Sequence, residues 1–355
     1  MSRPANDAPP ESDAFPGAPH PRFAPRLVGH AADEAAMLAA YREGRLAHAW
    51  LIGGREGIGK ATLAWRFARF VLANPDPSAA AAQTARDLAV ASDHPAARQL
   101  AALSHPDFAL ARREWNAKSK SFYSEIRVED VRDALSMFHM SAAFGGWRVA
   151  IVDCADELNP AGANALLKMI EEPPPRALIL VVAHQPGRVL PTIRSRCRKL
   201  LLDRLTPAEI EATIEGFGSP WNAIDSARRA QAAARADGSA REALRRLDPD
   251  AQDLGALIDA AIGQLPRSDP RLVHRLAEAV GDRAAGDSFA ALNAALCEWL
   301  ATRARAAESP AARRALTELW DRLRSATRET EALNLDRRLH VLAAFEDIAA
   351  QARRL

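Results

Sequence analysis

The sequence predicts an α/β domain built on a parallel sheet, followed by a region that is helical throughout. Three uninterrupted apolar runs, at residues 49–52, 149–152 and 177–182, alternate with helical patterns. Strands that are apolar along their whole length are typical of a parallel sheet covered by helices on both faces. After Thr206-Pro207, a pair that favours a helix start, strand-like runs almost disappear. With 355 residues, the chain is long enough for two or three domains.

The composition restricts the class of protein. Hydrophobic residues make up 48% and charged residues 26% of the chain, as in soluble globular proteins, and no window has the apolar length of a membrane span. Three cysteines form neither a disulfide framework nor a zinc quartet, and the N-terminus lacks a secretory signal, so we expect a reducing cytoplasm. The net charge of +2 excludes a generic polyanion binder. Only five of the 47 basic residues are lysines, so a lysine in a motif is more informative than an arginine.

The chain divides into four predicted segments. Residues 1–25 are rich in proline and predict a disordered tail. Residues 26–203 form the α/β core, and helix breakers near 216–220 and 249–253 separate a small helical unit, 204–250, from a second one, 251–355. Apolar stripes at helical spacing in the last segment predict core or subunit contacts; they are Leu292, Leu296, Trp299, Leu300, Leu316, Leu319, Trp320, Leu323, Leu335, Leu339, Leu342 and Phe345.

The first strand runs into a glycine-rich loop that predicts phosphate binding. Gly54, Gly57 and Gly59 precede Lys60, and a helical pattern follows. Glycines allow backbone N–H groups to turn toward a phosphate, the helix N-terminus adds positive charge, and the lysine reaches the terminal phosphates. The alternative is a glycine-rich turn that binds nothing.

The residue after this lysine departs from the P-loop pattern. A Ser or Thr normally places its hydroxyl on magnesium there, and this chain has Ala61. Thr62 comes one residue later, and one residue rotates a helix by about 100°. Thr62 is a candidate nucleotide-site residue, but its hydroxyl cannot simply replace the magnesium-binding hydroxyl that position 61 lacks. We therefore expect weak ATP or ADP binding, or none.

The second apolar run ends in Asp153, a carboxylate placed to hold magnesium or its water opposite the P-loop. In hydrolysing enzymes of this kind a glutamate follows and polarises the attacking water, and here the residue is Cys154. Asp156 and Glu157 lie beyond the strand end, at angles that the sequence leaves open. The alternative reading of Cys154 as a redox or nucleophilic cysteine lacks an adjacent His or basic cluster that would lower its pKa. The sequence therefore lacks two groups that ATP hydrolysis needs: a hydroxyl at position 61 and a carboxylate at position 154.

Three motifs downstream are specific in their order: Asn-Ala-Leu-Leu-Lys at 164–168, Glu-Glu-Pro-Pro at 171–174 and Ser-Arg-Cys at 195–197. On these motifs the chain resembles the delta-prime family of bacterial DNA polymerase III clamp-loader subunits, which are AAA+ relatives of the gamma/tau ATPases and of eukaryotic replication factor C. The matching stretches cover nearly the whole chain past residue 25. The resemblance implies an AAA+ P-loop core (26–203), a helical lid (204–250) and an all-α collar (251–355) through which five subunits form an open ring.

The resemblance also implies roles for two arginines. The Ser-Arg-Cys arginine, Arg196, would reach the ATP of a neighbouring subunit as an arginine finger in trans; otherwise it is one of many surface arginines. Arg241, in the lid sequence Gly-Ser-Ala-Arg, matches an arginine that senses nucleotide in cis; the alternative is a helix-surface arginine paired with an acid. His184 takes the place of a polar sensor, and its role stays open.

The expected function is that of a non-hydrolysing clamp-loader subunit. Its partners would be the gamma/tau and delta subunits, with the sliding clamp and primer-template DNA engaged through the complex, and no membrane. No cofactor is required, and no zinc is expected because residues 73–103 contain no cysteine. An active gamma/tau-like ATPase would need a hydroxyl at 61 and a carboxylate at 154, and a P-loop kinase leaves the Ser-Arg-Cys motif and the helical C-terminal region unexplained.

Overall fold

The computed structural model describes residues 10–119, 121–265, 267–281, 286–333 and 335–353. The chain forms two compact units, one of Met1–Asn116 with Phe122–Leu244 and the other of Ala117–Ser121 with Arg245–Leu355. The division into core, lid and collar stays a prediction, because the first unit groups the predicted lid through Leu244 with the sheet.

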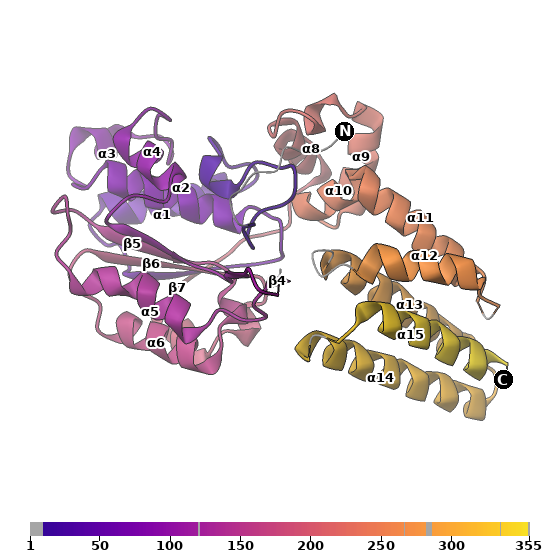
Figure 1. The fold of residues 1–355 in the computed structure, drawn as a ribbon. Coiled ribbons are helices and arrows are strands. Elements are labelled where there is room, and N and C mark those ends of the chain that lie inside the picture. The colour runs from indigo at the N-terminus through magenta and orange to yellow at the C-terminus, as the bar shows by residue number, and fades with distance from the viewer. Residues whose placement is uncertain (1–9, 120, 266, 282–285, 334, 354–355) are drawn as a thin grey trace. The chain divides into compact units, whose positions relative to one another are not determined.

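A five-stranded parallel sheet forms the centre of the first unit (Figure 1). Its order is β2-β5-β6-β1-β7, and the strands are β1 (Ala49–Gly53), β2 (Phe108–Ala111), β5 (Arg148–Val152), β6 (Ala177–Ala183) and β7 (Arg198–Leu201). Every residue of β1, β5 and β6 is buried, which explains why these three strands are apolar throughout and confirms the three predicted ones. Two short strands, β3 (Trp115–Asn116) and β4 (Ser121–Phe122), pair separately.

Helices cover both faces of this sheet (Figure 1). In that view α1, α2, α3 and α4 lie on one side, and α5 and α6 lie on the other. The α/β fold class is the predicted one, with a P-loop between β1 and α2. The helices are α1 (Ala31–Arg42), α2 (Lys60–Ala73), α3 (Ala80–Thr84), α4 (Pro95–Ala101), α5 (Val128–Ser136), α6 (Pro160–Glu171) and α7 (Pro191–Arg196), with short 3₁₀ turns η1 (Pro21–Phe23), η2 (Met137–His139), η3 (Ala155–Glu157) and η4 (Pro186–Arg188).

The predicted lid consists of helices only. They are α8 (Pro207–Glu215), η5 (Trp221–Ala223), α9 (Ser226–Arg235) and α10 (Ala240–Leu247). The predicted helix start at Thr206-Pro207 is confirmed by a capping box: Thr206 Oγ1 accepts a hydrogen bond from the Glu209 N–H, and Glu209 Oε2 accepts one from the Thr206 N–H at 2.7 Å.

The second unit contains the remaining helices, α11 (Pro249–Gly263), α12 (Pro270–Gly281), α13 (Gly286–Ala306), α14 (Pro310–Ala332) and α15 (Arg337–Ala352). Most of the predicted stripe residues form its core, among them Leu292, Leu296 and Phe345. Leu335 and Leu339 are exceptions, because both side chains are exposed. Among the residues that the structure describes, no helix has the length and apolar character needed to span a membrane.

The N-terminal segment differs from the predicted disordered tail of residues 1–25. Residues 1–9 lie outside the described residues, but 11–25 pack on the first unit and include the buried His20. The backbone carbonyls of Arg22 and Ala24 accept hydrogen bonds from Arg69, and that of Pro25 accepts one from Arg66. Prolines and small residues cannot build a core alone. Here, side chains from distant parts of the chain donate hydrogen bonds to the backbone carbonyls of the segment and hold it in place.

Candidate functional site

The P-loop connects the buried strand β1 to helix α2. Gly54, Gly57 and Gly59 have φ angles of 141°, 77° and 105°, in the range that glycine adopts readily. Lys60 is the first residue of α2 and is 2% exposed, and its Nζ donates to the carbonyl of Arg55 in the same loop. Burial lowers the pKa of Lys60 to about 8. The predicted strand, loop and helix are therefore confirmed, with the lysine held inside the loop.

The next two residues lie in the first turn of α2. Ala61 and Thr62 are both half-buried. Ala61 has no hydroxyl for magnesium, and Thr62 follows it by one helical position, which turns its side chain by about 100°. In the structure, position 61 therefore lacks the hydroxyl that the P-loop pattern places there, as the sequence indicates.

Asp153 lies directly after β5 and faces the P-loop lysine. The side chain is 3% exposed, and the backbone N–H donates to the carbonyl of Ala111 at the end of β2 at 2.9 Å. The pKa of Asp153 is raised to about 7, chiefly by burial and also by the nearby Asp13 carboxylate, while the Lys60 ammonium acts in the opposite direction. The structure therefore brings Lys60 and Asp153 together at the carboxyl end of the sheet, as predicted.

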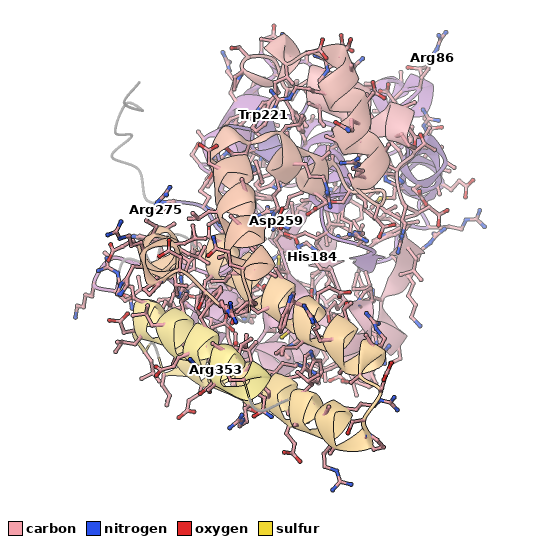
Figure 2. All side chains as sticks on the ribbon, turned by 90° about the vertical axis from the view of Figure 1, so that its right-hand side faces the viewer. Arg86, His184, Trp221, Asp259, Arg275 and Arg353 are labelled. Atoms are coloured by element: carbon pink, nitrogen blue, oxygen red, sulfur yellow. The ribbon has the colours of Figure 1, made fainter. Side chains whose placement is uncertain are left out.

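Cys154 occupies the position at which the sequence predicts that a water-polarising acid is absent. Its backbone has φ 60°, and its Sγ lies 3.4 Å from Nε2 of His184, which follows β6 (Figure 2). Burial raises the pKa of the Cys154 thiol, so a thiolate is disfavoured. Burial, together with the positive charge of Lys60, lowers the pKa of His184 to about 4. The expectation that no histidine lies next to Cys154 was therefore wrong, and the pair is a half-buried contact between a thiol and a neutral imidazole.

The two acids that follow Cys154 are engaged in other contacts. Asp156 accepts hydrogen bonds from the backbone N–H groups of His184 at 2.9 Å and Gln185 at 3.1 Å. Glu157 forms an ion pair with Arg113 at 2.6 Å. Each carboxylate thus stabilises the end of the sheet, and neither takes the place of the missing glutamate.

The start of α10 lies directly on the P-loop. The N–H of Ala240 donates to the carbonyl of Gly57 at 2.9 Å, and Ser239 Oγ donates to the carbonyl of Glu56 at 2.8 Å. Arg241 forms an ion pair with the Glu56 side chain at 2.9 Å. Arg241 therefore reaches the P-loop, as a cis-acting residue would, and it is also paired with an acid, as the alternative interpretation required. Sequence reasoning missed Glu56 as its partner.

Arg196 is bonded to residues of α6 and α7. It ends α7, where Ile193 and Cys197 are buried and anchor the turn, while the Arg196 side chain is 44% exposed. Its Nη1 donates to the carbonyl of Thr192 at 3.2 Å, and its Nη2 lies 3.0 Å from Glu171 Oε1. Glu171 is the first glutamate of the Glu-Glu-Pro-Pro motif. Sequence reasoning did not predict that this motif contacts the Ser-Arg-Cys motif. The guanidinium is thus held by exposed groups and accessible to solvent.

A family model described as DNA polymerase III, delta subunit matches residues 31–206. The DNA polymerase III subunit delta' of Pseudomonas aeruginosa is 39% identical over 151 residues, which are 42% of this chain and 42% of that protein. The delta' subunit of Escherichia coli is 32% identical over 162 residues, 46% of this chain and 44% of that protein. The chain thus aligns with less than half the length of these curated relatives.

More distant relatives align over a longer part of the chain. The DNA polymerase III subunit tau of Escherichia coli is 29% identical over 68% of this chain and 36% of its own length. Among solved structures, a DNA polymerase III gamma subunit-related protein from Thermotoga maritima is 14% identical with a TM-score of 0.40, covering 89% of this chain and 99% of that one. Residues 31–206 thus match the DNA polymerase III, delta subunit family model, and curated delta' subunits are among the relatives of the chain.

Proposed function

We propose that this chain is a delta' subunit of a DNA polymerase III clamp loader, and that it supplies Arg196 in trans to ATP bound by a neighbouring ATPase subunit. The observation that carries the proposal is a contrast within one unit. The P-loop site lacks a metal hydroxyl at Ala61 and an acid at Cys154, whereas Arg196 presents its guanidinium to solvent. The chain would therefore contribute to hydrolysis on another subunit and not on itself.

The chemistry of a guanidinium suits this role. Arginine is always charged and offers forked donors that match the oxygens of a transferring phosphoryl group. The contact of Arg196 with Glu171 is exposed, and exposed ion pairs contribute only about 0–1 kcal/mol. A phosphate on a neighbour can therefore compete for the guanidinium at little cost, because the pairing inside this chain is weak.

The proposed partners are the gamma/tau and delta subunits, and the complex would act on a sliding clamp and primer-template DNA in the cytoplasm. Subunits named delta' and tau are among the relatives of the chain, which supports this assembly. We propose further that the chain requires no cofactor of its own: any ATP or ADP at the Lys60 loop would bind weakly, and no zinc is needed.

Substitution of Arg196 in a reconstituted clamp loader tests the proposal. Arg196→Ala should lower DNA- and clamp-stimulated ATP turnover by at least about threefold, since a finger contributes about 10³–10⁵ to kcat at the site it serves. Assembly, followed by gel filtration, should be unchanged. Arg198→Ala is the matched control, because the Arg198 guanidinium lies over the Trp50 ring at 4.5 Å within this chain. Turnover by Arg196→Ala equal to that of the control would contradict the finger.

The second candidate is an active ATPase of the gamma/tau kind. The similarity to the tau subunit over 68% of this chain favours it. It requires a hydroxyl at position 61 and a carboxylate at position 154, where this chain has Ala61 and Cys154. ATP hydrolysis by the isolated chain distinguishes the two candidates.

A further inference from the structure

The N-terminal segment is held within the first unit by partly buried ion pairs. Arg112 directly follows β2 and bonds both Glu11, at 2.8 Å, and Asp13. His20 Nε2 lies 3.0 Å from Asp13 Oδ2, and Arg22 also pairs with Glu11. The Asp13 side chain is almost entirely buried. Burial alone would raise the pKa of Asp13, but the hydrogen bond from His20 and the charges of His20 and Arg112 hold it below its ordinary value.

The same segment also contacts the predicted lid. The indole Nε1 of Trp221 (labelled in Figure 2) donates to the carbonyl of Gly17 at 2.7 Å. The rings of Phe15 and Trp221 lie 6.1 Å apart, and the Arg241 guanidinium lies 5.5 Å from the centroid of the Phe15 ring. Residues 11–17, which we call the clasp, therefore touch the core at one end and the lid at the other.

Both ends of the clasp lie at the P-loop site. On the core side, its partner Arg112 follows Ala111, whose carbonyl accepts the Asp153 N–H. On the lid side, its partner Arg241 pairs with Glu56 of the P-loop. The Asp13 carboxylate is also close enough to raise the pKa of Asp153. The clasp thus spans the edge of the site between the carboxyl end of the sheet and the start of α10.

We propose that residues 11–17 are an intramolecular clasp that holds the lid closed on the P-loop, so that closure of this subunit does not depend on nucleotide. In the absence of the clasp, the contacts of Ala240, Ser239 and Arg241 and the ion pair between Asp237 and Arg55 would remain between the lid and the P-loop. The clasp adds one hydrogen bond, one aromatic contact and one contact between a cation and a ring to these. The proposal goes beyond the function proposed above and does not depend on whether Arg196 is a finger.

Hydrogen exchange of the full chain tests the clasp. In a variant lacking residues 1–18, backbone amides of 237–244 should exchange at least about tenfold faster than in the full chain, while amides of β5 and β6 stay protected. Excess ATP with magnesium should leave lid exchange in the full chain unchanged. Lid exchange within about twofold of the full chain after the deletion would overturn the proposal, and so would a lid that only ATP protects.

If the deletion also speeds hydrogen exchange in β5 and β6, a point variant distinguishes loss of the clasp from general destabilisation. Phe15→Ala removes the ring between Arg241 and Trp221 and leaves the ion pairs of Glu11 and Asp13 in place. It should accelerate exchange in residues 237–244 alone. Phe23→Ala is the matched control, since Phe23 is an exposed aromatic of the same segment whose ring contacts are to His20 and Arg22. Equal lid exchange in the two variants would count against the clasp.

Discussion

Asp153 shows how burial and nearby charge determine the behaviour of a single residue at this site. Its carboxylate is close enough to the buried Lys60 and to the Asp13 carboxylate for their charges to affect its pKa, which is raised from 3.8 to about 7. Lys60 is affected in the opposite sense, with a pKa lowered to about 8. Burial favours the neutral form of both groups, so the pair is less strongly charged at neutral pH than the same residues would be in water.

The first prediction at this scale concerns Asp153→Asn. Because the folded pKa lies above the ordinary one, the native state binds more protons than the unfolded state between about pH 4 and 7. This group therefore lowers the free energy of unfolding as pH rises through that window. The difference in unfolding free energy, variant minus wild type, should increase from pH 5 to pH 8 by on the order of 1–3 kcal/mol. Urea denaturation at several pH values measures it.

A surface aspartate provides the control for this pH series. Asp76 is exposed, and its hydrogen bonds from Ser78 lower its pKa, so it stays deprotonated from pH 5 to 8. Asp76→Asn should give a difference from wild type that does not change over this range. A similarly flat difference for Asp153→Asn would show that the carboxyl is not protonated in the folded protein at neutral pH.

At the scale of elements, the contact between the P-loop and α10 leaves no space for a side chain at Gly57. A Cβ there would lie 2.5 Å from both Arg241 Cβ and Ser239 Oγ, at a φ of +77°. We expect Gly57→Ala to lower the free energy of unfolding by about 1–3 kcal/mol more than Gly44→Ala. Gly44 has a similar φ of +64°, and nothing lies within 4 Å of its added Cβ. Chemical denaturation of both variants separates the steric clash at Gly57 from the backbone strain that both positions share. Equal decreases in the free energy of unfolding would contradict a tight contact between the lid and the P-loop.

The predictability of each element from sequence depended on where its partners lie. Strands β1, β5 and β6 are buried along their whole length, so local apolar runs were sufficient to predict them. The edge strand β7 was not predicted, because it is short and its four residues are mostly exposed and include Arg198 and Lys199. The N-terminal segment was predicted to be disordered because its partners, such as Arg112, are about a hundred residues away in sequence.

The candidate site was predictable from the sequence only in part. The P-loop glycines, Lys60 and Asp153 follow a local pattern of strand, turn and helix, and the structure places them as expected. The contact between Cys154 and His184 joins residues thirty positions apart, and no local spacing indicates it. The roles of Arg196 and Arg241 were available only through the family resemblance, and these roles stay predictions.

At the scale of the whole molecule, the candidate nucleotide site is buried, whereas Arg196 is exposed. Lys60 and Asp153 are 2% and 3% exposed, and the Ala240 N–H of the predicted lid donates to the Gly57 carbonyl of the loop. The Arg196 side chain, on the same unit, is 44% exposed. Such a distribution suits a subunit that changes little itself and acts on a neighbour.

The last prediction is that the purified chain does not hydrolyse ATP. Phosphoryl transfer to water requires metal ions to neutralise charge and a group to orient the attacking water, and removal of either raises the barrier. Ala61 and Cys154 supply neither group, and Asp156, the first acid after Cys154, is bonded to backbone N–H groups instead. Phosphate release should therefore equal that of a Lys60→Ala variant, the matched control for contaminating activity. Turnover that Lys60→Ala abolishes would show that the chain completes its own site, and the gamma/tau-like alternative would replace the proposed function.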